Sequence, residues 1–492
     1  MKDFRQKTIS ALTWSGAIQS SQYGFQFLIS VVLARLLTPT DFGLIGMVMV
    51  LTGFAAKFSD LGMGAALVQK LDVTEEQTDS VFWINIMIGL GLTALFFFSA
   101  PLIALFYQEP ALIPLTRVLA FIFIFHAFGN VHRIVLQRKL DFKRIAQVEV
   151  SSLLIGGGLA IGMAVMGFGV WSLVAQPIVN GLLNSLFFWI IVDWRPGFRF
   201  KSDKIGELTS FAFHLLGFDF FNYWFRQLDN VLIGWKWGSA SLGLYSRAYN
   251  LMVFPISRLG GLITRVMFPA LSAIQEDTAR VKRVYLQVTR GIALLTFPLM
   301  IGMLVVADNF ILSVFGSQWM GAVPVLKLLC VSGLFQSIGT TVGWIYTSQG
   351  RTDIMFRWGV ASGIVRITAF VIGVHWGITG MAAAVVISGL VLWIPSWVIP
   401  GRLIHLRFSE MVKNLLSLFF SAIFMGIVVA AAGLVTPANW PAPVELALQI
   451  LLGGACYLAI VHIFNVQAYI EVRDVVVSKI KSKRAKKVEG NE

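Results

Sequence analysis

The chain has 492 residues, of which 57% are hydrophobic and only 13% are charged. A soluble domain carries roughly 25% charged residues, so this composition excludes a set of soluble globules and predicts an all-α membrane protein that crosses the bilayer many times. In a soluble protein, the net charge of +14 would suggest that the protein binds nucleic acid. Basic and aromatic surface segments do not alternate, however, so we expect no nucleic-acid binding and place the excess charge in cytoplasmic loops.

Apolar runs long enough to cross a bilayer recur along the whole chain and predict about fourteen transmembrane helices. A spanning helix needs roughly 20 mostly apolar residues. Polar breaks follow the sixth run, at 193–204, and the twelfth run, at 401–413. The runs lie near 10–34, 42–64, 80–104, 110–132, 146–167, 170–193, 207–235, 242–267, 284–306, 323–347, 353–375, 378–400, 414–435 and 443–465.

Basic residues gather in every second connection between these runs. If the N-terminus is cytoplasmic, the inner connections carry most of the Lys and Arg, while the outer ones hold little more than Arg35 and Lys236. The positive-inside rule then predicts an even number of spans with both termini cytoplasmic. The basic tail either lies against the anionic inner leaflet or is simply solvated.

Short motifs recur about 200 residues apart. Phe42-Gly43-Leu44 opens the second run and Leu242-Gly243-Leu244 opens the eighth, and Gln137 recurs as Gln349 at the ends of the fourth and tenth. Six spans return the chain to its starting side, so the two units should be parallel repeats with substrate between them. The expected parts are an N-lobe over 1–200, a C-lobe over 201–405, two more spans over 406–466 and a basic tail over 467–492.

Polar side chains share one helix face inside two matching spans. Span one carries Gln19, Gln22 and Gln26, and span seven carries charged residues about 200 positions later. A charge at the centre of a spanning helix costs roughly 2.5–3.5 kcal/mol, so we expect these residues to face a watery cavity and bind substrate or a coupling ion. The charged set is Asp219, Arg226 and Asp229 in span seven, Arg247 and Arg258 in span eight, and Arg366 in span eleven.

A purely structural role stays open for several of these residues. Arg226 and Asp229 stand three positions apart and either neutralise each other or act separately. Cys330 and Cys456 lie in apolar runs without metal or redox spacing, and no hydrolase, zinc or phosphate-loop motif occurs. We therefore expect no catalytic residue, metal or cofactor. Pairing or packing alone is an alternative for Lys57 with Asp60, Arg265, His126 and His214.

The stretch from Leu33 to Gly43, LARLLTPTDFG, resembles the ARLLTPxDFG turn of bacterial polysaccharide flippases. FSDLG at 58–62 and QLDN at 227–230 are similar to further landmarks of that family. With its fourteen predicted spans, the chain resembles the polysaccharide transporter branch of the multidrug/oligosaccharidyl-lipid/polysaccharide (MOP) superfamily. Its nearest resemblance is to Wzx-type flippases of the colanic-acid exporter kind. The resemblance covers essentially the whole chain. It indicates the family but not which glycan is transported.

The resemblance implies a flippase that moves undecaprenyl-diphosphate-linked oligosaccharide across the bacterial inner membrane by alternating access. Such a protein serves the biosynthesis of exopolysaccharide or O-antigen-type lipopolysaccharide, and polysaccharide polymerase machinery is a partner that the resemblance suggests. The arginines would bind the diphosphate and the glutamines the sugar hydroxyls. Asp219 or Asp229 would couple a gradient of H⁺ or Na⁺, unless the membrane potential alone acts on the anionic substrate.

Two other functions compete with this one. A MATE-like cation-coupled drug exporter has the same architecture, but a cationic drug should prefer an acidic or aromatic cavity. A membrane glycosyl ligase or polymerase needs a catalytic constellation on a large outer loop, whereas the longest outer connection, 308–322, holds one carboxylate and no histidine. An enzyme is therefore not expected.

Overall fold

The computed structural model describes residues 21–59, 62–70, 72–197, 206–437, 439–471 and 473–474, without the side chains of 65, 66, 206–222, 259, 262 and 265. Within these ranges the regular secondary structure is entirely helical, which confirms the all-α prediction. The chain divides into two compact units, Met1–Leu244 and Tyr245–Glu492. This division falls inside α8 (Gly206–Ser272), which consists of two helices that meet at a kink at Gly238, where φ is 76°. The predicted repeat boundary near residue 200 stays a prediction.

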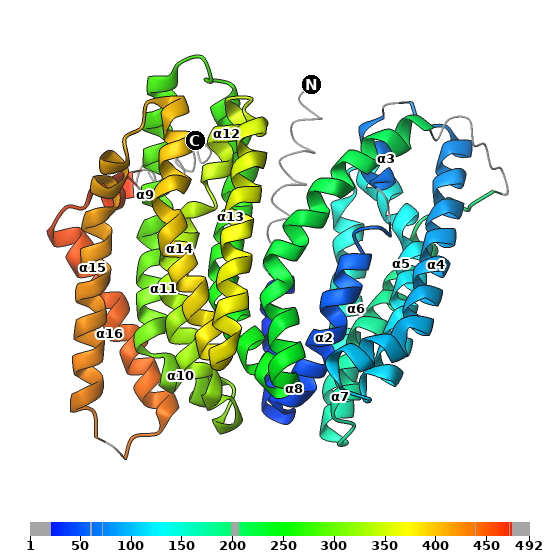
Figure 1. Ribbon diagram of the computed structural model, residues 1–492, viewed down its shortest axis with the longest axis horizontal. Helices are drawn as coiled ribbons and strands as arrows, with labels where there is room; N and C mark the ends of the chain where they lie inside the picture. Colours follow the sequence, from blue (N-terminus) through cyan, green and yellow to red (C-terminus); the bar gives the residue numbers. More distant parts are fainter. Residues whose placement is uncertain are drawn as a thin grey trace, which may run out of the picture. The chain divides into compact units, whose positions relative to one another are not determined.

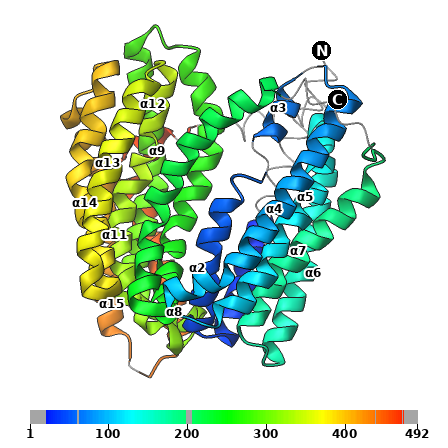
Figure 2. The same cartoon turned by 45° about the vertical axis from the view of Figure 1, so that its right-hand side comes forward.

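The first unit is a bundle of long helices, in which α5 contacts both α4 and α7, and α7 also contacts α6 (Figures 1 and 2). Residues 21–36 are helical. The other elements are α2 (Pro39–Ala55), α3 (Met63–Gln69), α4 (Glu75–Tyr107), α5 (Leu112–Arg138), α6 (Phe142–Val165), α7 (Val170–Ile191) and the part of α8 (Gly206–Ser272) up to Leu244.

The second unit begins with the rest of α8, and α9 packs against both α11 and α15 (Figure 1). Its α14 contacts α11 and α13. After α8 the elements are α9 (Thr278–Val305), α10 (Ala307–Val314), η2 (Ser317–Ala322), α11 (Val323–Gly339), α12 (Val342–Ser348), α13 (Thr352–Gly373), η3 (Val374–Trp376), α14 (Gly377–Gly401), η4 (Arg402–Ile404), α15 (Phe408–Val435) and α16 (Ala442–Ile463).

Nine helical segments in the described part of the chain are long and apolar enough to cross a membrane. The protein is therefore a multi-pass membrane protein. Each of the fourteen predicted apolar runs contains helix where its residues are described. The second run is interrupted, because α2 ends at Ala55 and α3 begins at Met63. The number fourteen itself stays a prediction.

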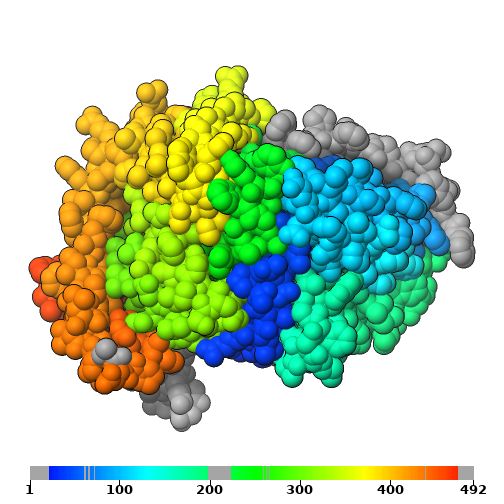
Figure 3. Space-filling view, turned by 60° about the horizontal axis from the view of Figure 1, so that its bottom comes forward, coloured from blue at the N-terminus to red at the C-terminus, as the bar shows by residue number. Residues whose placement is uncertain are grey.

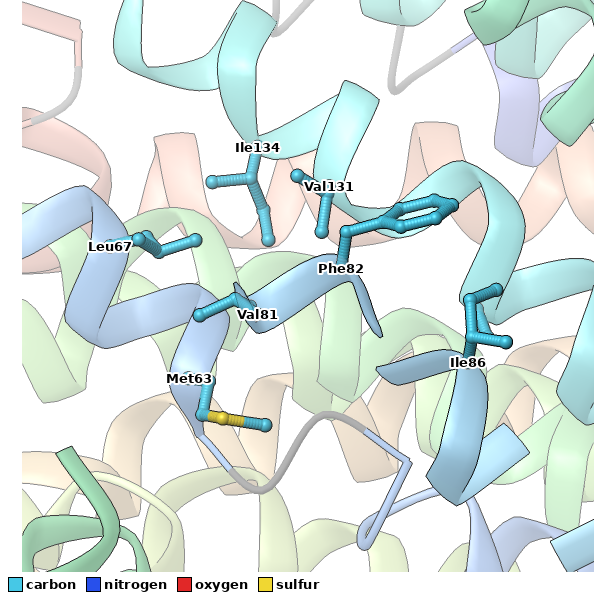
Figure 4. Packing of buried hydrophobic residues seen from close by; sticks show 8 residues of the cluster. Met63, Leu67, Val81, Phe82, Ile86, Val131 and Ile134 are labelled. Carbon is cyan, nitrogen blue, oxygen red and sulfur yellow. The ribbon is translucent and has the colours of Figure 1, made fainter. Parts of the chain in front are cut away.

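Apolar side chains from α3, α4 and α5 form a core at one end of the first unit (Figure 4). Phe82 is 2% exposed and Val131 is completely buried. Burial of a large apolar side chain stabilises a fold by roughly 1.5–3 kcal/mol in water; here it fixes the short helix α3 against its longer neighbours. The cluster consists of Met63, Leu67, Val81, Phe82, Ile86, Ala127, Val131 and Ile134.

The LTPTDFG stretch is the start of α2. Thr38 is the N-cap, and its hydroxyl accepts a hydrogen bond from the Asp41 amide at 3.3 Å. The Asp41 carboxylate accepts one from the Thr38 amide at 2.9 Å. Pro39 occupies the first helical turn, where its missing N–H is not needed. This capping box satisfies backbone donors that would otherwise lack partners, so the sequence motif has a physical reason.

Further along this turn, α2 crosses α8 directly after the kink at Gly238, at two matching glycines. A Cβ atom on Gly43 would collide with the carbonyl of Ser239, and one on Gly243 would collide with the carbonyl of Pro39. Figure 3 shows one face of the molecule, at which residues from the N-terminal part of the first unit, in blue, reach the surface. Because the contacts are reciprocal at an offset of 200 residues, the two repeated motifs form a pseudo-symmetric crossing that only glycine permits.

The turns that follow α5 and α12 have the same backbone conformation. Leu140 and Gly350 both adopt positive φ, at 56° and 66°. In each turn the next amide donates to the carbonyl five residues earlier, at 3.0 Å and 2.8 Å. The turns are thus equivalent at an offset of 210 residues, two fewer than the match between Gln137 and Gln349 suggests. Both the crossing and these turns support the internal repeat.

Candidate functional site

A polar cluster in the first unit joins three helices. The Gln22 Nε2 donates a hydrogen bond to Oε2 of Glu149 at 3.2 Å. The Arg133 Nε donates to Oε1 of the same carboxylate at 3.1 Å, which forms an ion pair. Gln22 comes from helix 21–36, Arg133 from α5 and Glu149 from α6. The polar face predicted for span one therefore contacts a charged pair from two neighbouring helices.

Helix 21–36 reaches this cluster because it runs along α6 in the same direction. Gln22 contacts Glu149, and two turns later Ile29 lies against Gly157, where a Cβ atom would collide with the Ile29 side chain. Because Gly157 has no side chain, helix 21–36 and α6 can approach each other closely. Gln26 lies between these contacts along helix 21–36 and is exposed.

Arg133 and Glu149 were not among the residues predicted to form a site. The sequence does show a charged residue at each of these positions, within the segments that form α5 and α6. Both residues lie near the ends of predicted spans, where a charge costs little because it reaches the headgroups. The two residues are 16 positions apart in the sequence, and they come into contact only because α5 and α6 form a hairpin.

In the first half of α8, Arg226 and Asp229 lie in different surroundings. Arg226 is exposed. Asp229 is 3% exposed, and its Oδ1 accepts a hydrogen bond from the Asn230 amide at 2.8 Å. The Asn230 side-chain amide donates in turn to Gln227 Oε1 at 2.8 Å. Asp229 is thus a buried carboxylate within a polar stretch of one helix, as an ion-coupling residue would need to be.

In the second unit, Arg247 lies over two aromatic rings. Its guanidinium carbon is 5.1 Å from the ring centroid of Phe315 and 5.1 Å from that of Trp319. Phe315 is 1% exposed and Trp319 is fully buried. Both rings belong to the turn between α10 and α11, so the cation–π contacts tie α8 to that turn.

Arg258 and Arg366 are less enclosed. The Arg258 guanidinium lies 5.3 Å from the ring centroid of Phe254, one turn earlier on α8, and this ring is 38% exposed. Arg366 is exposed on α13. Guanidinium groups at such positions offer planar forked donors to a phosphate.

Several predicted residues lie outside what the structure describes. Gln19 and the tail beyond Asp474 fall in undescribed residues, and so does Asp60, the predicted partner of Lys57. At Asp219, His214 and Arg265, the structure describes the backbone of α8 but not the side chain.

Comparison with known proteins places the chain among polysaccharide biosynthesis proteins. Residues 32–324 match the family described as "Polysaccharide biosynthesis protein". The chain is 30% identical to the teichuronic acid biosynthesis protein TuaB of Bacillus subtilis (strain 168), over 97% of this chain and 99% of TuaB. It is also 30% identical to the lipopolysaccharide biosynthesis protein WzxC of Escherichia coli (strain K12), over 75% of each chain. The predicted resemblance to Wzx-type proteins is confirmed.

The fold is similar to that of a solved structure described as "Lipid II flippase MurJ, inward closed conformation". The TM-score is 0.71 over 94% of this chain and 99% of that one, at 17% sequence identity. At this low identity the similarity shows a shared fold, and it does not assign functional residues in this chain.

Proposed function

Since the chain belongs to the family of polysaccharide biosynthesis proteins, we propose that it is a flippase for lipid-linked oligosaccharides. It translocates undecaprenyl-diphosphate-linked repeat units across the bacterial inner membrane by alternating access, for exopolysaccharide or O-antigen-type biosynthesis. The observation that carries this proposal is the similarity to TuaB over nearly the full length of both chains. No covalent bond of the substrate changes, so the protein is a transporter and not an enzyme.

The diphosphate is bound by arginines of α8 and α13. A dianionic headgroup is excluded by lipid, and guanidinium groups replace its hydration with charge-assisted hydrogen bonds. Arg226 and Arg366 are exposed, and Arg258 lies on a partly exposed ring. The aromatic contacts of Arg247 favour a structural role for that residue. Gln19, Gln22 and Gln26 bind sugar hydroxyls of the substrate.

Transport is coupled to an H⁺ or Na⁺ gradient through a carboxylate of span seven. Asp229 is the better candidate, since it is 3% exposed, and Asp219 is the second. Both termini lie in the cytoplasm, as the distribution of basic residues favours. A polysaccharide polymerase acts on the product at the outer side and is a natural partner.

The test is reconstitution into liposomes with a defined lipid-diphosphate oligosaccharide, scoring how much of it becomes accessible in each leaflet. The wild-type protein should equilibrate the lipid between leaflets. Arg258→Gln should abolish this at normal protein abundance, and Arg258→Lys should restore it only in part, because an ammonium keeps the charge but loses the fork. Transport of a cationic drug, with no movement of the lipid, would reject the proposal in favour of a drug exporter.

A further inference from the structure

The ion pair between Arg133 and Glu149 has no place in the binding of the diphosphate. Its net charge is zero, and its carboxylate would repel a phosphate. The pair is nevertheless reachable, because the side chains of Arg133 and Glu149 are 46% and 30% exposed. Gln22, which contacts the same carboxylate, is half-buried.

The three side chains have hydrogen-bonding capacity left over. Among the described residues, Arg133 uses only its Nε, so its two terminal nitrogens stay available as donors. Each oxygen of Glu149 accepts one hydrogen bond, from Gln22 or Arg133, and each can accept another. The cluster therefore presents donors and acceptors side by side, without net charge.

The adjoining helix α7 adds carboxamides whose acceptors lack donors. The Oδ1 atoms of Asn180 and Asn184 are buried and accept no hydrogen bond within the described residues. Asn180 lies against Gly156 of α6, two turns from Glu149. Since buried polar atoms are nearly always satisfied in native proteins, these acceptors indicate that water or a hydroxylated ligand completes this interior.

We propose that Gln22, Arg133 and Glu149 form a subsite for the sugar hydroxyls of the transported glycan. A hydroxyl both donates and accepts, so neighbouring hydroxyls can donate to the carboxylate and accept from the guanidinium at once. The inference rests on the proposed function and deepens it, since it assigns glycan recognition to a neutral subsite separate from the cationic residues that bind the diphosphate.

The test compares two lipids in the same liposomes. One is the undecaprenyl-diphosphate oligosaccharide accumulated by cells that lack this protein, and the other is that lipid trimmed enzymatically to its first sugar. Glu149→Gln should raise the half-saturating concentration of the full-length lipid about tenfold, through lost hydrogen bonds. The trimmed lipid should be transported as by the wild-type protein. Gln22→Ala should show the same selectivity while it leaves the ion pair in place.

Asp308→Asn is the matched control. It breaks the Lys327–Asp308 pair of the second unit, at 2.5 Å and with side chains 42% and 52% exposed, and it should alter neither lipid's transport. If Glu149→Gln lowers both lipids equally, in proportion to folded protein, the pair merely ties α5 to α6 and the subsite is rejected. Wild-type-like transport of both lipids by Glu149→Gln and Gln22→Ala also rejects it, while the flippase function stands. A wild-type protein that flips neither lipid overturns the function and the subsite together.

Discussion

The contacts of Arg247 with two aromatic rings favour a structural role for this residue over substrate binding. A guanidinium over aromatic rings is held by its flat face, and such contacts contribute about 0.5–2 kcal/mol each. Arg247→Lys keeps the charge but loses the planar group, so we expect it to lower the stability of the protein by about 1 kcal/mol. Thermal unfolding in detergent measures this, and flipping per folded molecule should stay close to wild type.

Arg258→Lys is the comparison at the same scale. Its ring, Phe254, is 38% exposed and lies on the same helix, so the stability should change less than in Arg247→Lys, while transport falls more. The reverse pattern, with Arg247→Lys stable but inactive, would place Arg247 in the substrate site.

At the scale of elements, the crossing of α2 and α8 depends on two glycines. Gly43→Ala places a methyl group inside the backbone of Ser239, and Gly243→Ala places one inside that of Pro39. Each variant should separate the helices and lower the melting temperature of the purified protein. Because both act on one crossing, the double variant should lose less than the sum of the two single losses.

Gly158→Ala is the matched control for this crossing. Gly158 lies in α6 and has no atom within 4 Å of an added Cβ. Alanine there should keep or raise stability, since it favours helix over glycine by roughly 0.5–1 kcal/mol. If Gly43→Ala unfolded at the same temperature as Gly158→Ala, the close crossing would be absent from the protein in detergent.

The sequence predicted the helices well because run length and apolarity decide a span, and both are local properties. The LTPTDFG start of α2 is also recognisable from the sequence, because its capping box is a local pattern of four residues. The contacts of Arg133 with Glu149, and of Arg247 with Phe315 and Trp319, depend on which helices become neighbours. Periodicity places a side chain on a face of its own helix, but it does not say which partner that face meets.

At the scale of the whole molecule, the orientation in the membrane can be tested from the first unit. The start of α2 and the end of α4 both meet residue 239, through Gly43 and through a hydrogen bond from Ser239 Oγ to Glu109 at 3.1 Å. These ends therefore share one side, while the α5–α6 turn lies at the opposite end of α5. Ser239 is 4% exposed, so the exposed neighbour Ala240 is the better site for a label.

We expect single cysteines at Thr40, Gln108 and Ala240 to react with an impermeant thiol reagent added to intact cells. All three positions are exposed at the side predicted to face outward. A cysteine at Lys139, in the α5–α6 turn, should react only after the cells are permeabilised. The background replaces Cys330 and Cys456, the two natural cysteines, and each variant must still support flipping. Labelling of Lys139→Cys in intact cells, with protection of Thr40→Cys, would invert the topology and place both termini outside.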